Sequence, residues 1–284
     1  MAGHRNFELS LRIGREQVRL SIRIPEAPLS LVDLLPLLNS LTELTTAVAG
    51  REAAAAGRPV RCAPGCGACC RQLVPVAPAE AVALRATIAG LEPRHRERVE
   101  ARFTAATRQF LTSGLTEQLA ASDPTGRDRP QVPVSRRRLG LEYFAQAIPC
   151  PFLEQESCSI HPHRPLACRE YLVASDPSHC ARPASDTVAV VELPRRLSQL
   201  LLKLGAELAP EQPRWLPLSL ALQPEGFDEA LVAQARQPGP LLFERIIAWL
   251  TQGGSPDGGT GKESSLSTTN PPVAPANNGG KTSV

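Results

Sequence analysis

The chain has 284 residues, of which 42% are hydrophobic and 21% are charged, and its formal net charge is +3. This length suits one or two domains with a sizeable core, and the ordinary composition excludes a wholly disordered chain. The weak net charge gives no reason to expect a nucleic-acid partner. We see no run of about 18 apolar residues and no apolar signal segment at the start, so we expect no membrane partner and a cytoplasmic location. Because only 4% of the residues are aromatic, Leu, Val and Ala must fill the core, which favours helices.

The N-terminal part of the chain predicts a β-hairpin followed by a helix. Between residues 7 and 24, apolar and polar residues alternate on both sides of a turn at Gly14, which is typical of two paired strands with one buried face. Ser30 is then placed to cap a helix whose apolar positions recur at helical spacing over residues 31–48. Pro36 falls inside this pattern and predicts either a kink or a later helix start.

Helical patterns continue along the rest of the chain. Predicted helices cover residues 78–89, 93–111, 135–147, 194–208 and 240–250. Residues 122–134 predict a loop from their Pro and Gly content, and residues 187–193 predict a strand. In residues 253–284, 23 of 32 residues are Gly, Ser, Thr, Pro or Asn, so we expect a disordered tail.

The eight cysteines carry the functional signal. They fall in two short windows, which hold Cys62, Cys66, Cys69 and Cys70, and then Cys150, Cys158, Cys168 and Cys180. In a reducing cytosol, clustered thiols are more often metal ligands than disulfides. A metal ion that bridges the two windows would close a loop of 79 residues, a cost that structural metal binding outweighs. Two separate sites are the competing arrangement, and both stay open at this point.

The adjacent pair Cys69 and Cys70 is predicted to be unequal. Neighbouring side chains diverge by about 100° on a helix and point to opposite faces on a strand. A single tetrahedral site would therefore accept only one of the two without strain. We predict that Cys69 shares an ion with Cys62 and Cys66, while Cys70 serves a second metal or stays a nearby thiol.

The cysteine pattern resembles a known family. The run C-x3-C-x2-C-C, followed downstream by C-P-F-L, C-x-I and R-P-x-x-C-R, is similar to the YkgJ-type CxxCxxCC family of zinc- or iron-chelating domains over residues 61–182. By matching position, the resemblance implies metal ligation by Cys62, Cys66, Cys69, Cys70, Cys150, Cys158 and Cys168. It also identifies Arg164, Pro165 and Arg169 as motif residues. The two arginines either lower the pKa values of the thiols and offset the charge of the cluster, or form a salt bridge to Glu154, Glu156 or Glu170, and both alternatives are open. Cys180 lies outside the motif and joins the candidate ligands through its clustering, and the roles of His161 and His163 are left open.

These observations predict a mainly α protein with a small N-terminal β-hairpin and a cysteine-rich, metal-centred helical domain with irregular loops. The expected regions are an N-terminal hairpin and helix (1–60), a cysteine-cluster metal-binding domain (61–182), a C-terminal helical segment (183–252) and the tail (253–284).

The function that we expect is cytosolic chelation of zinc or iron, including a 4Fe-4S cluster as one form of bound iron. The alternative is an iron–sulfur-dependent enzyme that transfers a methyl group or electrons, because the family pattern also resembles, distantly, that of flagellin lysine methylases. Cys62, Cys66 and Cys69 match the C-x3-C-x2-C spacing of radical S-adenosylmethionine enzymes as well, but the chain lacks the βα units of their barrel. With no glycine-rich nucleotide loop and no Ser–His–Asp pattern in view, enzyme activity and any protein partner stay open.

Overall fold

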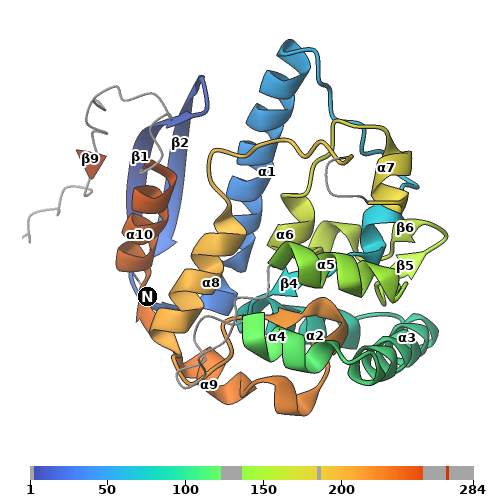
Figure 1. The fold of residues 1–284 in the computed structure, drawn as a ribbon. Coiled ribbons are helices and arrows are strands. Elements are labelled where there is room, and N and C mark those ends of the chain that lie inside the picture. Colours follow the sequence, from blue (N-terminus) through green and yellow to red (C-terminus); the bar gives the residue numbers. More distant parts are fainter. Residues whose placement is uncertain (1–2, 123–135, 184–186, 252–266, 269–284) are drawn as a thin grey trace, which may run out of the picture.

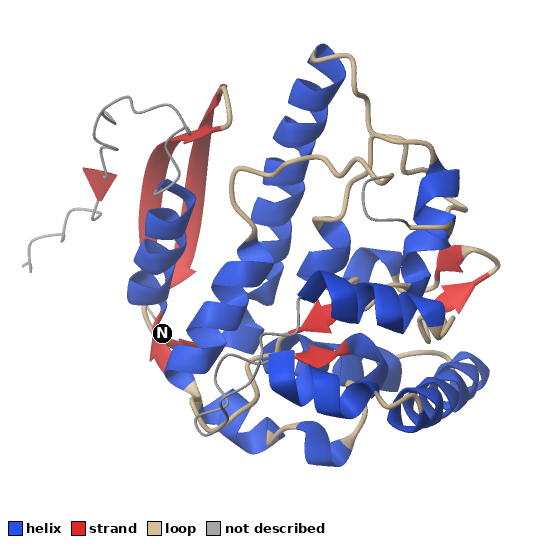
Figure 2. Cartoon of the chain, viewed as in Figure 1, coloured by secondary structure: helices blue, strands red, loops and turns tan. Residues whose placement is uncertain are grey.

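The computed structural model describes residues 3–122, 136–183, 187–251 and 267–268. Within these ranges it contains ten α-helices and an N-terminal β-hairpin, which confirms the predicted fold class (Figure 2). The helices are α1 (Leu31–Ala55), α2 (Pro78–Ala89), α3 (Pro93–Thr112), α4 (Leu115–Ser122), α5 (Arg136–Ala145), α6 (Leu166–Arg169), α7 (Pro177–Ala181), α8 (Leu197–Leu208), α9 (Glu229–Gln234) and α10 (Gly239–Thr251). The strands are β1 (His4–Ile13), β2 (Glu16–Pro25), β3 (Pro28–Ser30), β4 (Pro75–Val76), β5 (Leu153–Glu154), β6 (Ser157–Cys158), β7 (Leu216–Pro217), β8 (Arg236–Pro238) and β9 (Ser267–Thr268).

The predicted hairpin is confirmed and is longer than the alternating pattern. β1 and β2 pair antiparallel from His4 opposite Pro25 to Ile13 opposite Glu16, around a turn in which Gly14 has a φ of 57°. The alternating inward side chains of β1 are buried, and the Phe7 ring lies 4.6 Å from that of Phe243 on α10. A hairpin of two strands is marginal alone, so packing against α10 stabilises it.

Helix α1 begins where its capping residue predicts. Asp33 N donates to Ser30 Oγ at 3.2 Å and Ser30 N donates to Asp33 Oδ2 at 2.8 Å, which completes a capping box. The helix runs through Pro36, so the alternative of a later start is wrong. Among the described helices, α1 is long and apolar enough to cross a membrane by length and composition alone, although no such run was predicted from the sequence. Its apolar side chains, Leu34, Leu38 and Val48 among them, are buried in the core, so packing accounts for that composition.

The elements are arranged around α1 (Figure 1). The hairpin and α10 cover one side, α2, α3 and α9 lie at one end, and the short helices α6 and α7 lie on the side away from the hairpin. Helix α1 contacts α2, α6 and α8. A second, smaller core joins α3, α4 and α5 through Phe110, Leu115, Leu139 and Tyr143. The cysteine segments therefore sit against a framework that α1 and α2 hold in place.

The remaining local predictions have mixed outcomes. The helices at 78–89, 93–111, 135–147 and 240–250 are present with small changes at their ends, and the one predicted from residue 194 begins at Leu197. The predicted strand at 187–193 is wrong, because in the described part of that segment Val190 forms an isolated bridge with Val173. Its partner is an irregular loop, which offers no regular edge for a longer ladder. The predicted loop at 122–134 and tail at 253–284 lie outside the described residues, apart from Ser122 at the end of α4 and β9, which pairs with β1.

Candidate metal centre

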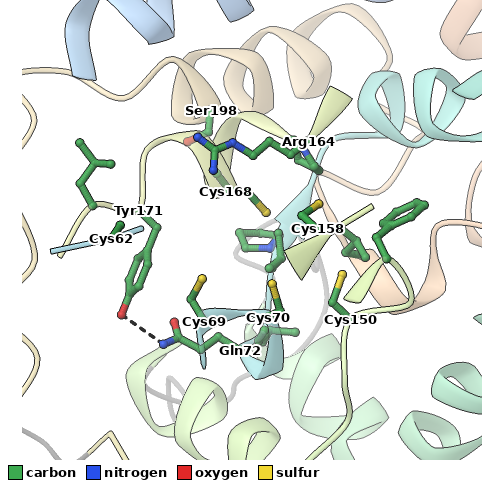
Figure 3. A pocket seen from close by; sticks show the side chains of 18 of the residues that line it. Cys62, Cys69, Cys70, Gln72, Cys150, Cys158, Arg164, Cys168, Tyr171 and Ser198 are labelled. Carbon is green, nitrogen blue, oxygen red and sulfur yellow. Dashed lines mark hydrogen bonds between the residues drawn. The ribbon is translucent and has the colours of Figure 1, made fainter. Parts of the chain in front are cut away.

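All eight cysteines of the chain line one cavity, which has a volume of about 1100 Å³. None of them forms a disulfide, and their exposure ranges from Cys62, which is exposed, to Cys180, which is buried. The two windows that are distant in sequence therefore contribute to one site, as Figure 3 shows for six of the thiols.

The first window is a tight turn followed by a 3-10 helix. Cys66 N donates to Ala63 O at 3.1 Å, and Gly65 adopts a φ of 82°, which favours glycine. Cys69 and Cys70 lie on the 3-10 helix η1 (Ala68–Arg71), where consecutive side chains point about 120° apart. At the start of the window, Val173 N donates to the Cys62 sulfur at 3.4 Å. The backbone thus spreads the four thiols around the turn instead of aligning them on one face.

Direct contacts hold the second window against the first. Cys150 N donates to Cys70 O at 2.7 Å. Arg71 forms a bidentate ion pair with Glu156, with distances of 2.6 and 3.0 Å, and Nη1 of Arg71 also donates to Gly67 O at 3.0 Å. Glu156 belongs to the turn between β5 and β6, so this pair fixes the hairpin that carries Cys158 against η1.

Buried polar side chains anchor the helix that carries Cys168. The carboxylate of Glu80 accepts from Ala77 N at 2.9 Å and from Leu166 N at 2.8 Å, so it joins the start of α2 to the start of α6. Arg169, at the end of α6, donates to Arg164 O at 3.0 Å and to Glu43 on α1 at 2.6 Å. These bonds fix α6 from both ends and thereby place Cys168 in the cavity wall.

The thiols of the two windows come together around η1. In Figure 3, the sulfur atoms of Cys69, Cys70, Cys150, Cys158 and Cys168 face a common space. Cys180 is brought to the first window because its helix α7 contacts η1, which carries both Cys69 and Cys70. The Cys69–Cys70 pair therefore lies between the thiols of the first window and those of the second.

Burial dominates the electrostatics of these thiols. It raises the pKa of Cys150 to about 12 and that of Cys180 to about 11, and it raises the pKa of Cys168 well above its usual value. Cys70 donates a hydrogen bond to Cys69, which lowers the pKa of Cys69 and raises that of Cys70. Without a cation, most of these groups are therefore neutral thiols, and a bound metal would have to displace their protons.

The motif arginines do not form the salt bridges that the sequence left open. Arg169 pairs with Glu43, while Glu154 pairs with Arg102 and Glu156 pairs with Arg71. Arg164 lines the cavity, and its charge opposes the burial that raises the pKa of Cys158.

The histidines take peripheral positions. His161 and His163 are exposed on a short 3-10 turn, and His161 lies in the cavity lining. The Arg164 charge, with a smaller effect of burial, lowers the pKa of His161.

Several residues that line the cavity were not predicted from the sequence. Gln72 donates to the Tyr171 hydroxyl at 3.1 Å, as Figure 3 shows, and this bond ties η1 to the segment after α6. Glu80 stands three positions after the N-cap residue Ala77, and a carboxylate at this position is the local signal for a bond back to the N-cap backbone. Trp215 and Trp249 also line the cavity, and nothing local in the sequence marks them for it.

The donor set fits zinc and iron, both of which accept tetrahedral thiolate coordination. In the described part of the chain, no three Cys, His, Asp or Glu side chains are already gathered closely enough to hold an ion, so the thiols must turn to do so. Eight free cysteines that line one cavity are typical of proteins that bind metals through thiolate ligands.

Comparison with known families agrees with this class. Residues 61–185 match the model of the CxxCxxCC family, "Putative zinc- or iron-chelating domain". The match covers all eight cysteines and extends three residues beyond the range that the motif resemblance predicts. The comparisons with curated proteins and with solved structures found no match.

Proposed function

We propose that the protein binds zinc or iron through two four-thiolate centres, one formed by Cys62, Cys66, Cys69 and Cys180 and the other by Cys70, Cys150, Cys158 and Cys168. The observation that carries this proposal is the convergence of all eight free cysteines on one cavity. Two observations support this partition: α7, which carries Cys180, contacts η1, and Cys150 N donates to Cys70 O. We assign Cys69 to the first centre because the C-x3-C-x2-C spacing joins it to Cys62 and Cys66.

Each set of four thiolates suits either a single zinc ion or one 4Fe-4S cluster, since both take four cysteine ligands. The short chain elements that carry the cysteines cannot preform the sites in an unfolded chain, so metal binding and the folding of this region are coupled. Free cysteines in such number also support a reducing compartment, and we place the protein in the cytoplasm on that basis.

The second candidate function is an iron–sulfur enzyme that transfers electrons or a methyl group. The observation that favours it is the size of the cavity, because about 1100 Å³ is far more than two metal centres with sulfur bonds of about 2.3 Å require. A substrate next to the thiolates would occupy the remaining space.

Anaerobic purification followed by metal and acid-labile sulfide analysis separates these forms. Zinc without sulfide would exclude the iron–sulfur enzyme, whereas iron with equimolar sulfide would exclude a zinc site. If the protein binds neither zinc nor iron after anaerobic reconstitution, the proposed function is wrong.

Paired substitutions test the partition. The within-set variant Cys62→Ser/Cys66→Ser should lose one centre and keep the other, whereas the cross-set variant Cys66→Ser/Cys158→Ser should lose both. Ala63→Ser is the matched control, because it adds a serine to the same turn without removing a thiol. If the within-set variant loses all its metal while its α-helical circular dichroism is unchanged, the eight thiolates form one polynuclear cluster and the partition is wrong.

A further inference from the structure

Beyond the cysteines, part of the cavity lining consists of cationic and aromatic side chains, and we call this part the wall. This wall consists of Arg196 at the N-terminus of α8, Lys203 within α8, Arg214 and Trp215 in the segment after α8, and Trp249 on α10. Helix α8 contacts α1 and α6, and α6 carries Cys168. A cavity of about 1100 Å³ is large enough for an organic molecule.

Aromatic rings are concentrated on this wall. The chain has two tryptophans in 284 residues, and both of them line the cavity. Trp215 and Trp249 are both half-buried, so part of each indole is exposed to a ligand in the cavity.

This part of the lining also carries positive charge. Among the described residues, the charged groups of Arg196, Lys203 and Arg214 form no hydrogen bond or ion pair. Two cations lie over the Trp249 ring, with Arg195 Cζ 5.3 Å and Lys203 Nζ 5.9 Å from its centre. The acidic residues of the lining are already used, because Glu80 accepts two backbone hydrogen bonds and Glu156 pairs with Arg71. Arg164 is the lining cation that acts on the thiols, whereas the charge of Arg196 acts on Glu170. Lys203 and Arg214 have no acidic partner among the described residues, so they are the cations most available to a ligand.

We propose that this wall binds a small organic anion with a planar ring, the anionic group on Arg196, Lys203 and Arg214 and the ring against Trp215 and Trp249. A carboxylate and a phosphate both satisfy this chemistry, because arginine and lysine donate charge-assisted hydrogen bonds to either group. The ring gains stacking and apolar contact with the indoles. This site stands independently of which metal the thiols bind.

Tryptophan fluorescence is a direct readout, since both tryptophans lie on the proposed wall. We would excite tryptophan alone and titrate the full-length protein with four probes: adenosine 5′-monophosphate, nicotinate, adenosine and inorganic phosphate. The first two combine a ring with an anion, and the last two supply one feature each. We expect at least one of the first two to change the fluorescence with an affinity about tenfold or more above that of adenosine and phosphate. Which of the two binds more tightly distinguishes a phosphate from a carboxylate ligand.

Substitutions locate the site. Arg214→Met and Lys203→Met should each weaken the tighter probe about tenfold, because each removes one charge-assisted contact. Arg94→Met is the matched control, since Arg94 is exposed on α3 and is absent from the cavity lining. Lys203 is exposed and makes no hydrogen bond, so its variant should fold even if Arg214→Met does not.

Chemical modification provides a second measurement. Lys203 is the one lysine in the described residues, and Lys262 and Lys281 complete the chain's set. The bound probe should slow reductive methylation of Lys203 relative to Lys262 and Lys281 in the same digest. The proposal is overturned if no ring-bearing anion binds, if inorganic phosphate competes as well as the tighter probe, or if both variants bind like the parent and Lys203 is not protected.

Discussion

Gly67 lies at a close contact between the first cysteine window and the β5–β6 hairpin, and replacing it with alanine tests whether that contact builds the site. A Cβ atom at this position would lie 2.6 Å from Glu156 Oε2, 2.7 Å from Leu153 Cδ1 and 3.0 Å from Glu156 Cα. The φ of Gly67 is −91°, which any residue adopts, so backbone strain is not involved. The effect of Gly67→Ala is therefore a steric one between the first turn and the β5–β6 hairpin.

The magnitude follows from which atoms can move. The side chains of Leu153 and Glu156 can rotate away, but the Glu156 backbone must shift by a few tenths of an ångström to reach ordinary contact. Overpacking of this kind costs about 1–3 kcal/mol. The shift would also loosen the Arg71–Glu156 ion pair, which holds the hairpin that carries Cys158. We expect a loss of stability of about 2 kcal/mol and weaker metal binding by the set that contains Cys70 and Cys158.

Urea unfolding and metal stoichiometry would be measured on the parent and three glycine variants. Gly140→Ala is the matched control, because nothing lies within 4 Å of its added Cβ and it is inside α5, where alanine should stabilise by about 0.5–1 kcal/mol. Gly65→Ala isolates backbone strain, because Gly65 has a φ of 82° and open space around it. If Gly67→Ala matches Gly140→Ala in stability and retains the parent's metal, the close contact has no role in forming the site.

Three further outcomes are expected. Burial raises the pKa of Glu80 to about 7, so between about pH 7 and 4.5 the folded protein holds a proton that the unfolded chain does not. As the pH falls through this window, the stability of the parent relative to Glu80→Gln should rise by up to about 3 kcal/mol. Urea unfolding measures this difference, with the exposed Glu97→Gln as control, and a difference that does not change with pH would refute the prediction. Phe103→Ala should cost about 3–5 kcal/mol, because the Phe103 ring is buried and packs edge-on against Phe152 at 5.2 Å, and a loss below about 1 kcal/mol would mean that this contact is not part of the folding core. Ser30→Ala should cost about 1 kcal/mol in thermal unfolding, since it removes the cap of α1, whereas an unchanged midpoint would show that the cap adds nothing.

Local patterns were sufficient for much of the fold. The alternation in residues 7–24 and the capping signal at Ser30 specify their elements through neighbours in the chain, and the structure reproduces both. The segment at 187–193 shows the limit of this reasoning. Its alternation suits a strand, but a strand also needs a regular partner, and the segment meets an irregular loop through the single bridge of Val190 with Val173.

The sequence by itself determined the chemistry of the candidate site, because eight clustered cysteines in this order specify soft thiolate donors wherever the chain folds. Only the tertiary structure decided which thiols are neighbours. Cys180 joins the first window because α7 packs on η1, and Cys150 meets Cys70 through a backbone hydrogen bond. The same packing pairs Arg169 with Glu43 and brings Trp215 and Trp249 to the lining of one cavity. The physical reason is that periodicity and capping act over a few residues, whereas these contacts join segments far apart in the chain and depend on how α1, α2 and α8 pack together.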